Sequence, residues 1–268
     1  MKNSGSTRIP FYQVDAFTSQ PFGGNPAGVC PLETWLEDEV LQSIAIENNL
    51  SETAFFIPTN DGYHLRWFTP GVEVDLCGHA TLAAAWVLFN KLGHADEQIR
   101  FHTRSGLLTV TRSGHEYCMD FPAKVATPIE TPAGLLAALG IDGEVVGVWR
   151  SDDLIVLVND KEVIEGLAPD FNTLVQFDTR GVIVTAADDR FDFVSRWFGP
   201  QVGVNEDPVT GSAHTFLAPF WAARTGKREL IAQQGGARKG TLRCLVRDDG
   251  RVELYGEARM TIEGTFLL

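Results

Sequence analysis

Residues 78–93 read GHATLAAAWVLFNKLG, and residues 211–226 read GSAHTFLAPFWAARTG. Each stretch opens and closes with glycine, and both pairs of glycines lie 133 positions apart (211 − 78 and 226 − 93). The side chains between the glycines are mostly apolar, and they leave no polar stripe. A helix without a polar face must be buried on every side, and glycine commonly ends a helix. We therefore predict two buried helices, over residues 79–89 and 212–223.

The sequence around these helices repeats in the same order. Arg-Trp-Phe-Thr-Pro at residues 66–70 returns as Arg-Trp-Phe-Gly-Pro at residues 196–200, before each predicted helix. A β-hairpin pattern follows each helix, at residues 107–121 and again at residues 242–255. Self-similarity at half the chain length predicts two copies of one α+β unit.

Short strand-like segments surround the predicted helices, and we expect a mixed sheet or barrel to wrap around the helix in each half. These segments lie at residues 11–16, 53–57, 63–68, 99–103, 154–158 and 181–185. An amphipathic helix is expected over residues 33–48. The expected N-terminal half is residues 1–124, joined by a strand near residues 260–268. The expected C-terminal half is residues 125–259.

The composition excludes several classes of partner. The chain has 268 residues, with 22 Lys and Arg against 35 Asp and Glu, so its formal charge is −13. An acidic chain without a basic patch is not expected to bind nucleic acid. The longest apolar run, residues 80–89, is too short to span a membrane. Residues 1–8 lead into no signal-peptide core, and the four cysteines form no CxxC pair. We expect a cytoplasmic protein with free thiols.

The N-termini of the two helices form the first candidate ligand site. Gly78 and Gly211 open the helices, and Ser212 follows the second glycine. Unpaired N–H groups and the positive end of the helix dipole favour an anion there. A single such glycine is most simply part of a helix cap. The same feature at matched positions of both halves indicates a small carboxylate-bearing ligand.

Four other side chains could carry acid–base chemistry. Glu52 lies between a predicted helix and an apolar strand, and a carboxylate can serve as a general acid or base. His79, Asp207 and Cys77 lie near the starts of the two buried helices. Each also has an ordinary alternative, as a cap, a packed side chain or a small buried filler. No spacing of His and Cys indicates zinc, and no glycine-rich loop indicates a nucleotide, so neither is expected.

Five motifs, taken in order, resemble the PhzF-like family of phenazine-biosynthesis isomerases. They are Phe22-Gly-Gly-Asn-Pro-Ala-Gly-Val29, Asn49-Leu-Ser-Glu-Thr53, Arg66-Trp-Phe-Thr-Pro70, Cys77-Gly-His-Ala-Thr81 and Glu206-Asp-Pro-Val-Thr-Gly-Ser-Ala213. The resemblance implies the diaminopimelate epimerase fold, with two pseudo-symmetric halves and the active-site cleft between them. It also implies a homodimer and the isomerisation of a small carboxylic acid without a cofactor. It does not imply phenazine synthesis itself.

The resemblance also implies roles at matching positions. Glu52 matches the catalytic acid/base of the family. His79 and Asp207 match the pair that contacts polar groups of the substrate and helps to position protons. The positions that bind the substrate carboxylate are matched by Gly78, Gly211 and Ser212.

The two halves are expected to differ chemically. Epimerases and racemases of the implied fold use one cysteine from each half, whereas this chain has Cys77 at the first position and Thr210 at the second. Thr cannot act as a second thiolate, so a two-thiol racemase is not expected. Glu52 has no counterpart one repeat later, near residues 185–189.

A single base on one face predicts that the proton is removed and returned on the same face, which is a 1,3-shift rather than an inversion. Two alternatives stay open. One is a one-thiol epimerase or dehydratase that uses Cys77 with Thr210. The other is a protein that binds a small carboxylate without turnover.

Overall fold

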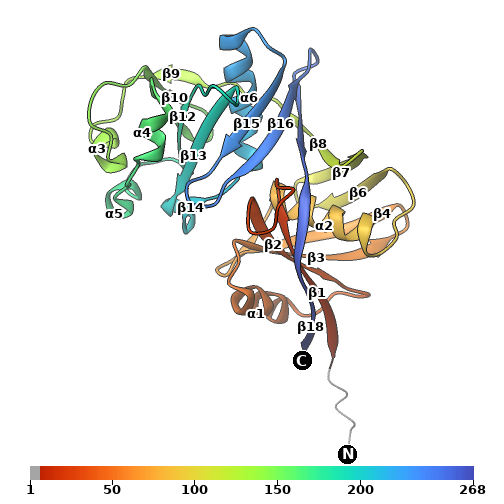
Figure 1. Cartoon of the computed structure of the whole chain (residues 1–268). Coiled ribbons are helices and arrows are strands. Elements are labelled where there is room, and N and C mark those ends of the chain that lie inside the picture. Colours follow the sequence, from red (N-terminus) through yellow and green to blue (C-terminus); the bar gives the residue numbers. More distant parts are fainter. Residues whose placement is uncertain (1–6) are drawn as a thin grey trace, which may run out of the picture. The chain divides into compact units, whose positions relative to one another are not determined.

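The chain folds into two compact units. Unit 1 comprises the residues up to Met119 together with Gly256–Leu268, and unit 2 comprises Asp120–Tyr255. The computed structural model describes residues 7–268, so most of the polar start, residues 1–6, lies outside the described part. Within unit 1 the last strand, β18 (Ala258–Leu267), pairs antiparallel with the first, β1 (Arg8–Ala16) (Figure 1).

Unit 1 is a mixed sheet with two helices, α1 (Asp38–Asn48) and α2 (Gly78–Asn90). In sheet order its strands are β18, β1, β2 (Asn25–Pro31), β3 (Glu52–Thr59), β4 (Gly62–Phe68), β6 (Gln98–Thr103), β7 (Gly106–Ser113) and β8 (Glu116–Pro122), with β5 (Glu73–Val74) paired to β4. The pairs β2–β3 and β4–β6 run parallel, and the other pairs in this series run antiparallel.

Unit 2 repeats this plan strand for strand. In sheet order its strands are β9 (Thr127–Ile129), β10 (Gly147–Arg150), β11 (Leu154–Leu157), β12 (Val182–Ala186), β13 (Phe193–Gly199), β15 (Glu229–Gln234), β16 (Gly240–Val246) and β17 (Arg251–Gly256), with β14 (Val204–Asp207) paired to β13. Its parallel pairs, β11–β12 and β13–β15, occupy the same two places in the order. The duplicated α+β architecture expected from the sequence is therefore confirmed.

The helix at the centre of each unit is one of the two predicted buried helices. α2 packs against β1, β2, β3, β7 and β18, and every side chain from His79 to Phe89 except Trp86 is buried. α6 (Gly211–Thr225) packs against β15 and β16 and is likewise largely buried. Each large apolar side chain buried in this way contributes about 1.5–3 kcal/mol. No helix in the described part of the chain is long and apolar enough to cross a membrane.

α6 contains a proline, which removes one backbone N–H donor from the helix. The carbonyl that would have paired with residue 219 belongs to Thr215. It accepts a hydrogen bond from the backbone N–H of Lys124 (2.9 Å). The helix therefore continues past Pro219 with this buried carbonyl satisfied.

The amphipathic helix expected over residues 33–48 begins later, at Asp38. Trp35, in the irregular segment before it, packs edge-on against His64, with ring centroids 5.1 Å apart. The guanidinium of Arg66 lies over the same indole. Trp35, which extends the apolar pattern of a helix, thus anchors the irregular segment before α1 to β4 instead.

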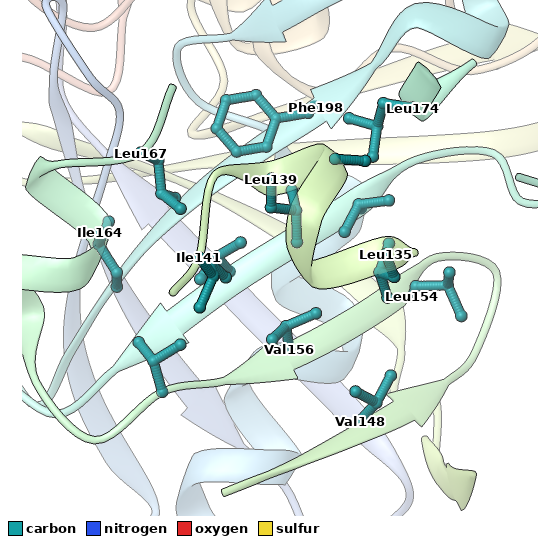
Figure 2. Close-up of a cluster of buried hydrophobic side chains, with 14 of the residues drawn as sticks. Leu135, Leu139, Ile141, Val148, Leu154, Val156, Ile164, Leu167, Leu174 and Phe198 are labelled. Carbon is teal, nitrogen blue, oxygen red and sulfur yellow. The ribbon is translucent and has the colours of Figure 1, made fainter. Parts of the chain in front are cut away.

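Three short helices cover one face of the unit 2 sheet: α3 (Leu135–Leu139), α4 (Lys161–Glu165) and α5 (Phe171–Leu174). Leu135 and Leu139 of α3 share a buried cluster with Val148 of β10, Val156 of β11 and Phe198 of β13 (Figure 2). Helices of four or five residues are too short to show a 3.6-residue period, so the sequence does not predict them.

The repeated Arg-Trp-Phe motif has a structural role in both units. Arg66 forms a two-pronged ion pair with Glu73 (2.7 and 2.8 Å), and Arg196 forms the same pair with Glu206 (2.8 Å for both bonds). Each guanidinium also lies 5.0 Å from the ring of the phenylalanine two residues later. The motif therefore ties β4 to β5 and β13 to β14, directly before the buried helices.

Strand register identifies the counterpart of Glu52. Thr53 pairs with Phe68 in unit 1, and Val182 pairs with Phe198 in unit 2, so Glu52 corresponds to the residue before Val182, which is Gly181. The helix-to-helix offset of 133 predicts this counterpart near residues 185–189, whereas the offset between these strands is 181 − 52 = 129. Unit 2 has no second glutamate, as predicted, but the position that matches Glu52 is 181 and does not lie within 185–189.

A side chain does not fit at Gly181. A Cβ atom there would lie 2.5 Å from Cζ2 of Trp197, well inside van der Waals contact. The indole is held in place because its Nε1 donates a hydrogen bond to Oδ2 of buried Asp153 (2.9 Å). Trp197 therefore fills the space in unit 2 that corresponds to the Glu52 side chain in unit 1.

We expect Gly181→Ala to lower the free energy of unfolding by about 1–3 kcal/mol, because the indole must move and its bond to Asp153 must stretch. Urea denaturation followed by circular dichroism measures the change. Gly264→Ala is the matched control, since a Cβ at Gly264 meets no atom within 4 Å. Equal, near-zero effects of the two substitutions would contradict the steric argument.

Candidate active site

Unit 1 brings together three of the predicted site residues. Glu52 is the first residue of β3, Cys77 precedes α2 as its N-cap, and His79 is the second residue of α2. His79 Nε2 lies 3.1 Å from Glu52 Oε2, and His79 Nδ1 lies 3.5 Å from Cys77 Sγ. His79 is 4% exposed and the Glu52 side chain 15%, so the pair is reached from solvent mainly through the carboxylate.

The contact between His79 and Glu52 leaves both partners with spare hydrogen-bonding capacity. Although the two atoms are 3.1 Å apart, neither Nε2 nor Oε2 forms a hydrogen bond of acceptable geometry with any described residue. Buried polar atoms are usually satisfied, and exceptions concentrate where a ligand or a reaction supplies the missing partner. The geometry therefore leaves both atoms able to bond to a bound molecule.

Asn25, which the sequence analysis did not single out, helps to orient the imidazole. It is fully buried in β2, and its side-chain amide lies 3.2 Å from His79 Nδ1, with the amide oxygen turned to the ring when Nδ1 carries a proton. The contacts of Nδ1 to Asn25 and Cys77 leave Nε2 as the ring nitrogen that faces Glu52. The signal for Asn25 was present in the Phe-Gly-Gly-Asn-Pro motif of residues 22–26, but without coordinates nothing connected that motif to α2.

The electrostatics of this group set its protonation state. Burial raises the pKa of the Cys77 thiol to about 11, and the nearby Glu52 charge acts in the same direction. Burial alone lowers the pKa of His79, but the adjoining Cys77 sulfur and Glu52 carboxylate raise that pKa well above 6.5. The Glu52 carboxylate lies close enough to favour a proton on His79.

The same three residues could also hold a metal ion. Each offers one ligand atom, and these atoms lie within 4.8 Å of one another. A spacing rule for His and Cys could not find this set, because Glu52 comes from a different element and only the fold brings it to the start of α2.

Unit 2 brings together the predicted residues around the start of α6. Thr210 is the N-cap, and its hydroxyl donates a hydrogen bond to Asp207 Oδ2 (2.6 Å). Gln234 of β15 completes a buried network. Its Nε2 donates to the Thr210 hydroxyl (3.0 Å) and to the Asp207 carbonyl (2.9 Å), while its Oε1 accepts from the Thr210 N–H (3.0 Å). The Thr210 hydroxyl is thus committed to Asp207 and Gln234.

Ser212 has a cationic neighbour that the sequence did not reveal. Arg180 Nη1 donates to Ser212 Oγ (2.8 Å), and Arg180 Nε donates to Asp153 Oδ1 (2.7 Å). Asp153 itself is fully buried. Arg180 and Asp153 are far from Ser212 in sequence and belong to none of the five motifs, so no pattern could have found them.

The two helix starts are built alike. Cys77 and Thr210 both have extended backbone conformations, and neither side chain accepts a hydrogen bond from the first turn of its helix. In α2 the hydroxyl of Thr81 donates to the Cys77 carbonyl, and in α6 Nδ1 of His214 lies 2.9 Å from the Thr210 carbonyl. The first-turn N–H groups that begin at Gly78 and Gly211 therefore lack a side-chain cap, as an anion site requires.

The predicted residues thus form two groups, one in each unit. The unit 1 group contains Glu52, Cys77, Gly78 and His79, and the unit 2 group contains Asp207, Thr210, Gly211 and Ser212. A cavity of about 420 Å³ in unit 2 is lined by residues of α4, β13 and the 235–239 loop, and by none of these eight residues. This cavity is therefore separate from both groups of predicted residues.

Comparison with known proteins agrees with the architecture. A solved PhzF-family structure from Enterococcus faecalis superposes with a TM-score of 0.94 at 45% identity, covering 98% of this chain and 100% of that one. A probable proline racemase from Agrobacterium radiobacter superposes with a TM-score of 0.60 at 11% identity, covering 97% and 93%. That second likeness concerns the fold alone, and it confirms the epimerase-like architecture expected from the resemblance.

Sequence relatives point the same way. A Pseudomonas aeruginosa protein named an uncharacterized isomerase is 60% identical over 97% of this chain and 99% of its own length. The family model described as phenazine biosynthesis-like protein, PhzC-PhzF, matches residues 14–264. The chain therefore belongs to the PhzF-type phenazine biosynthesis-like family.

Proposed function

We propose that this protein is an isomerase that moves a proton between two carbons of a small carboxylic acid without a cofactor. The observation that carries the proposal is the pair of Glu52 and His79, whose facing atoms lie 3.1 Å apart, with His79 buried and the Glu52 side chain partly open to solvent. A carboxylate so placed is a competent base, and an adjoining imidazolium can donate a hydrogen bond to the charge that develops. The isomerase name of the 60% identical relative agrees with this class.

The proposed reaction is a 1,3-shift. Glu52 accepts a proton from a carbon next to an unsaturated or carbonyl-bearing carbon, and the electron pair left behind shifts the double bond by one position. Glu52 then returns the proton to the far carbon, so substrate and product have the same composition. Throughout, the positive His79 side chain offsets the negative charge that builds up on the substrate.

The asymmetry of the repeat supports a single base. The position that matches Glu52 in unit 2 is Gly181, and the indole of Trp197 occupies the space of a side chain there. An inversion by two opposed bases needs a second base, which this position lacks. A shift in which one base removes and returns the proton on the same face needs only Glu52.

Two observations count against a thiol mechanism. Cys77 is a neutral thiol at pH 7 because its pKa is raised to about 11, and the thiolate is the reactive form. At the matching position of unit 2, the Thr210 hydroxyl is committed to Asp207 and Gln234. For Asp207, Gly78, Gly211 and Ser212 the proposed role is to hold the polar groups of the acid. The homodimer and the cytoplasmic location stay predictions.

Glu52→Gln tests the base directly. Incorporation of solvent deuterium into a panel of small unsaturated carboxylic acids should fall by at least about 100-fold, because the amide cannot accept a carbon-bound proton. Exposed Glu97 provides the control, and Glu97→Gln should exchange at the wild-type rate. Dialysis of the wild-type protein against a chelator should leave exchange unchanged. Exchange by Glu52→Gln at the wild-type rate would overturn the assignment. Binding without any exchange across the panel would favour a carboxylate-binding protein without turnover.

Cys77→Ala separates the isomerase from a one-thiol enzyme. We expect the exchange rate to stay within about threefold of wild type, because the thiol is not the base, whereas loss of a catalytic thiolate costs orders of magnitude. Cys30→Ala removes a different buried thiol of unit 1 and corrects for any general packing effect. A fall of 100-fold or so for Cys77→Ala alone would support the epimerase or dehydratase alternative.

The raised pKa of His79 makes the stability of unit 1 depend on pH. A histidine whose pKa is raised in the folded state contributes stability that is fully present below its unfolded pKa and is lost as pH rises through the folded one. We therefore expect the difference in unfolding free energy between wild type and Glu52→Gln to be largest near about pH 6 and to shrink at alkaline pH. Urea denaturation across this range measures it. A difference that does not change with pH over this range would show that His79 is neutral.

A further inference from the structure

The cavity of about 420 Å³ in unit 2 lies beside α4 and β13. Its apolar side chains include Ile164 of α4, Leu167 just beyond that helix, and Val194 of β13, and Figure 2 labels the first two. No residue of α6 lines it. Pockets of this volume commonly bind small organic molecules. The cavity is therefore large enough to take a ligand of its own.

Unit 1 fills the corresponding place with the side chain of Trp35. The repeated Arg-Trp-Phe motif matches Arg66 with Arg196, and therefore matches His64 with Val194 two residues earlier. In unit 1 the indole of Trp35 packs on both residues, with its ring 5.1 Å from the His64 ring and 5.1 Å from the Arg66 guanidinium. In unit 2 both counterparts line the cavity. The cavity thus lies where unit 1 has an aromatic ring.

The difference comes from the connection that enters the first helix of each unit. Residues 32–37 join β2 to α1 and include Trp35, whereas residues 158–160 join β11 to α4 and contain no aromatic side chain. The shorter connection does not line the cavity. The indole therefore has no counterpart in unit 2, and the same fold leaves its place open there.

Arg196 is held in one orientation at the edge of this cavity. Its Nε and Nη2 each donate to Glu206 (2.8 Å), and its Nη1 donates to the carbonyls of Ile164 and Leu167 (3.1 Å each). These four bonds use four of the five N–H donors of an arginine. The flat face of the guanidinium, rather than its edge, is therefore what Arg196 can offer to a ligand.

The repeat also indicates which chemical group fits against that face. Arg66 has two aromatic neighbours, the rings of Trp35 and Phe68, at 5.1 and 5.0 Å. Arg196 has one among the described residues, the ring of Phe198 at 5.0 Å. A guanidinium attracts aromatic rings to its face. A planar aromatic group in the cavity would therefore take the place of the missing indole beside Arg196.

Basic side chains outnumber acidic ones around the cavity. The charged lining residues are Lys161, Arg190, Arg196 and Lys239 against Glu165 and Asp188. Lys161 pairs with Asp188 (3.1 Å), and Arg196 pairs with Glu206 (2.8 Å). Exposed Arg190 and Lys239 form no ion pair within the described part of the chain. In a protein whose formal charge is −13, this local excess of cations favours an anionic ligand.

We infer that this cavity is a second small-molecule site, which takes a planar aromatic ring carrying a negatively charged group. The ring lies beside Arg196, where unit 1 has the indole of Trp35, and the charged group binds Arg190 and Lys239. The lining shares no residue with the candidate active site, so the inference goes beyond the proposed isomerase.

Indole-3-acetate is a suitable probe because it carries the ring of Trp35 and a carboxylate. Indole-3-acetamide keeps the ring without the charge, and acetate keeps the charge without the ring. Titration of the ¹⁵N-labelled protein with indole-3-acetate should move the backbone amide signals of Val194, Gly236 and Ala237, which line the cavity. The dissociation constants of the two other compounds should be higher by about tenfold or more. Equal affinity for indole-3-acetate and indole-3-acetamide would overturn the inference.

A double variant, Arg190→Gln with Lys239→Gln, removes the two cations that have no carboxylate partner. Both side chains are exposed, so the variant should fold as the wild type does. Its dissociation constant for indole-3-acetate should rise by about tenfold or more, because the carboxylate loses its charged donors. Arg228→Gln is the control, since Arg228 is an exposed arginine of the same unit outside the cavity lining, and it should bind as wild type does. Wild-type affinity in the double variant would overturn the inference.

The positions of the moving signals separate this cavity from the candidate active site. Indole-3-acetate is itself a carboxylate and could bind at the helix starts instead. Movement confined to the amide signals of Gly78, Gly211 and Ser212 would place the probe there and overturn the inference, as would no movement at all. Loss of binding by the double variant, together with deuterium exchange at the wild-type rate, would confirm that the two sites are separate.

Discussion

The structure depends on the burial of two helices that have no polar face. α2 and α6 have no polar face, so each must be enclosed by strands over nearly its whole length. The starts of such helices cannot be solvated as surface helices are, and their first N–H groups must find partners in the protein or in a ligand. Most of the candidate chemistry lies there because these are the points where the fold leaves strong hydrogen-bonding capacity unused. The position of the candidate site therefore follows from the burial of these two helices.

Much of this arrangement is visible in the sequence. The two glycine-bounded stretches predict the helices, and the repeated Arg-Trp-Phe motif predicts the duplication, because both signals arise from local pattern and from matched order. The family resemblance alone implied that Glu52 and His79 act together, and the structure shows their side chains 3.1 Å apart with Cys77 beside His79.

The remaining parts of the site depend on contacts between distant segments. Asn25 and His79 are 54 positions apart in the sequence, and Arg180 and Ser212 are 32 apart. No local sequence pattern predicts either contact. The counterpart of Glu52 was placed several residues too late because the offset between the halves changes from 129 to 133 along the chain, as loop lengths differ. Register between strands, which single-sequence patterns do not contain, was needed to find Gly181.

The two histidines of the central helices show how one scaffold yields two chemistries. Both are buried, but His79 has a carboxylate beside it and its pKa is raised, whereas burial lowers the pKa of His214 to about 4. His214 is therefore neutral, and its Nδ1 donates a hydrogen bond to the Thr210 carbonyl, whereas the pKa of His79 favours the protonated form. The cation of unit 2 is supplied by Arg180 instead, which is held from outside the helix.

The indole of Trp197 over Gly181 also bears on how such a duplicated protein can change. Recovering a second acidic base in unit 2 would require a side chain at position 181, and that side chain has no room until Trp197 is replaced by something smaller. Replacing Trp197 first would remove a hydrogen-bond donor from Asp153, the residue that holds Arg180. A substitution at position 181 alone or at Trp197 alone is therefore destabilising, and both are needed to place a side chain at position 181. The two halves therefore cannot exchange roles through a single substitution.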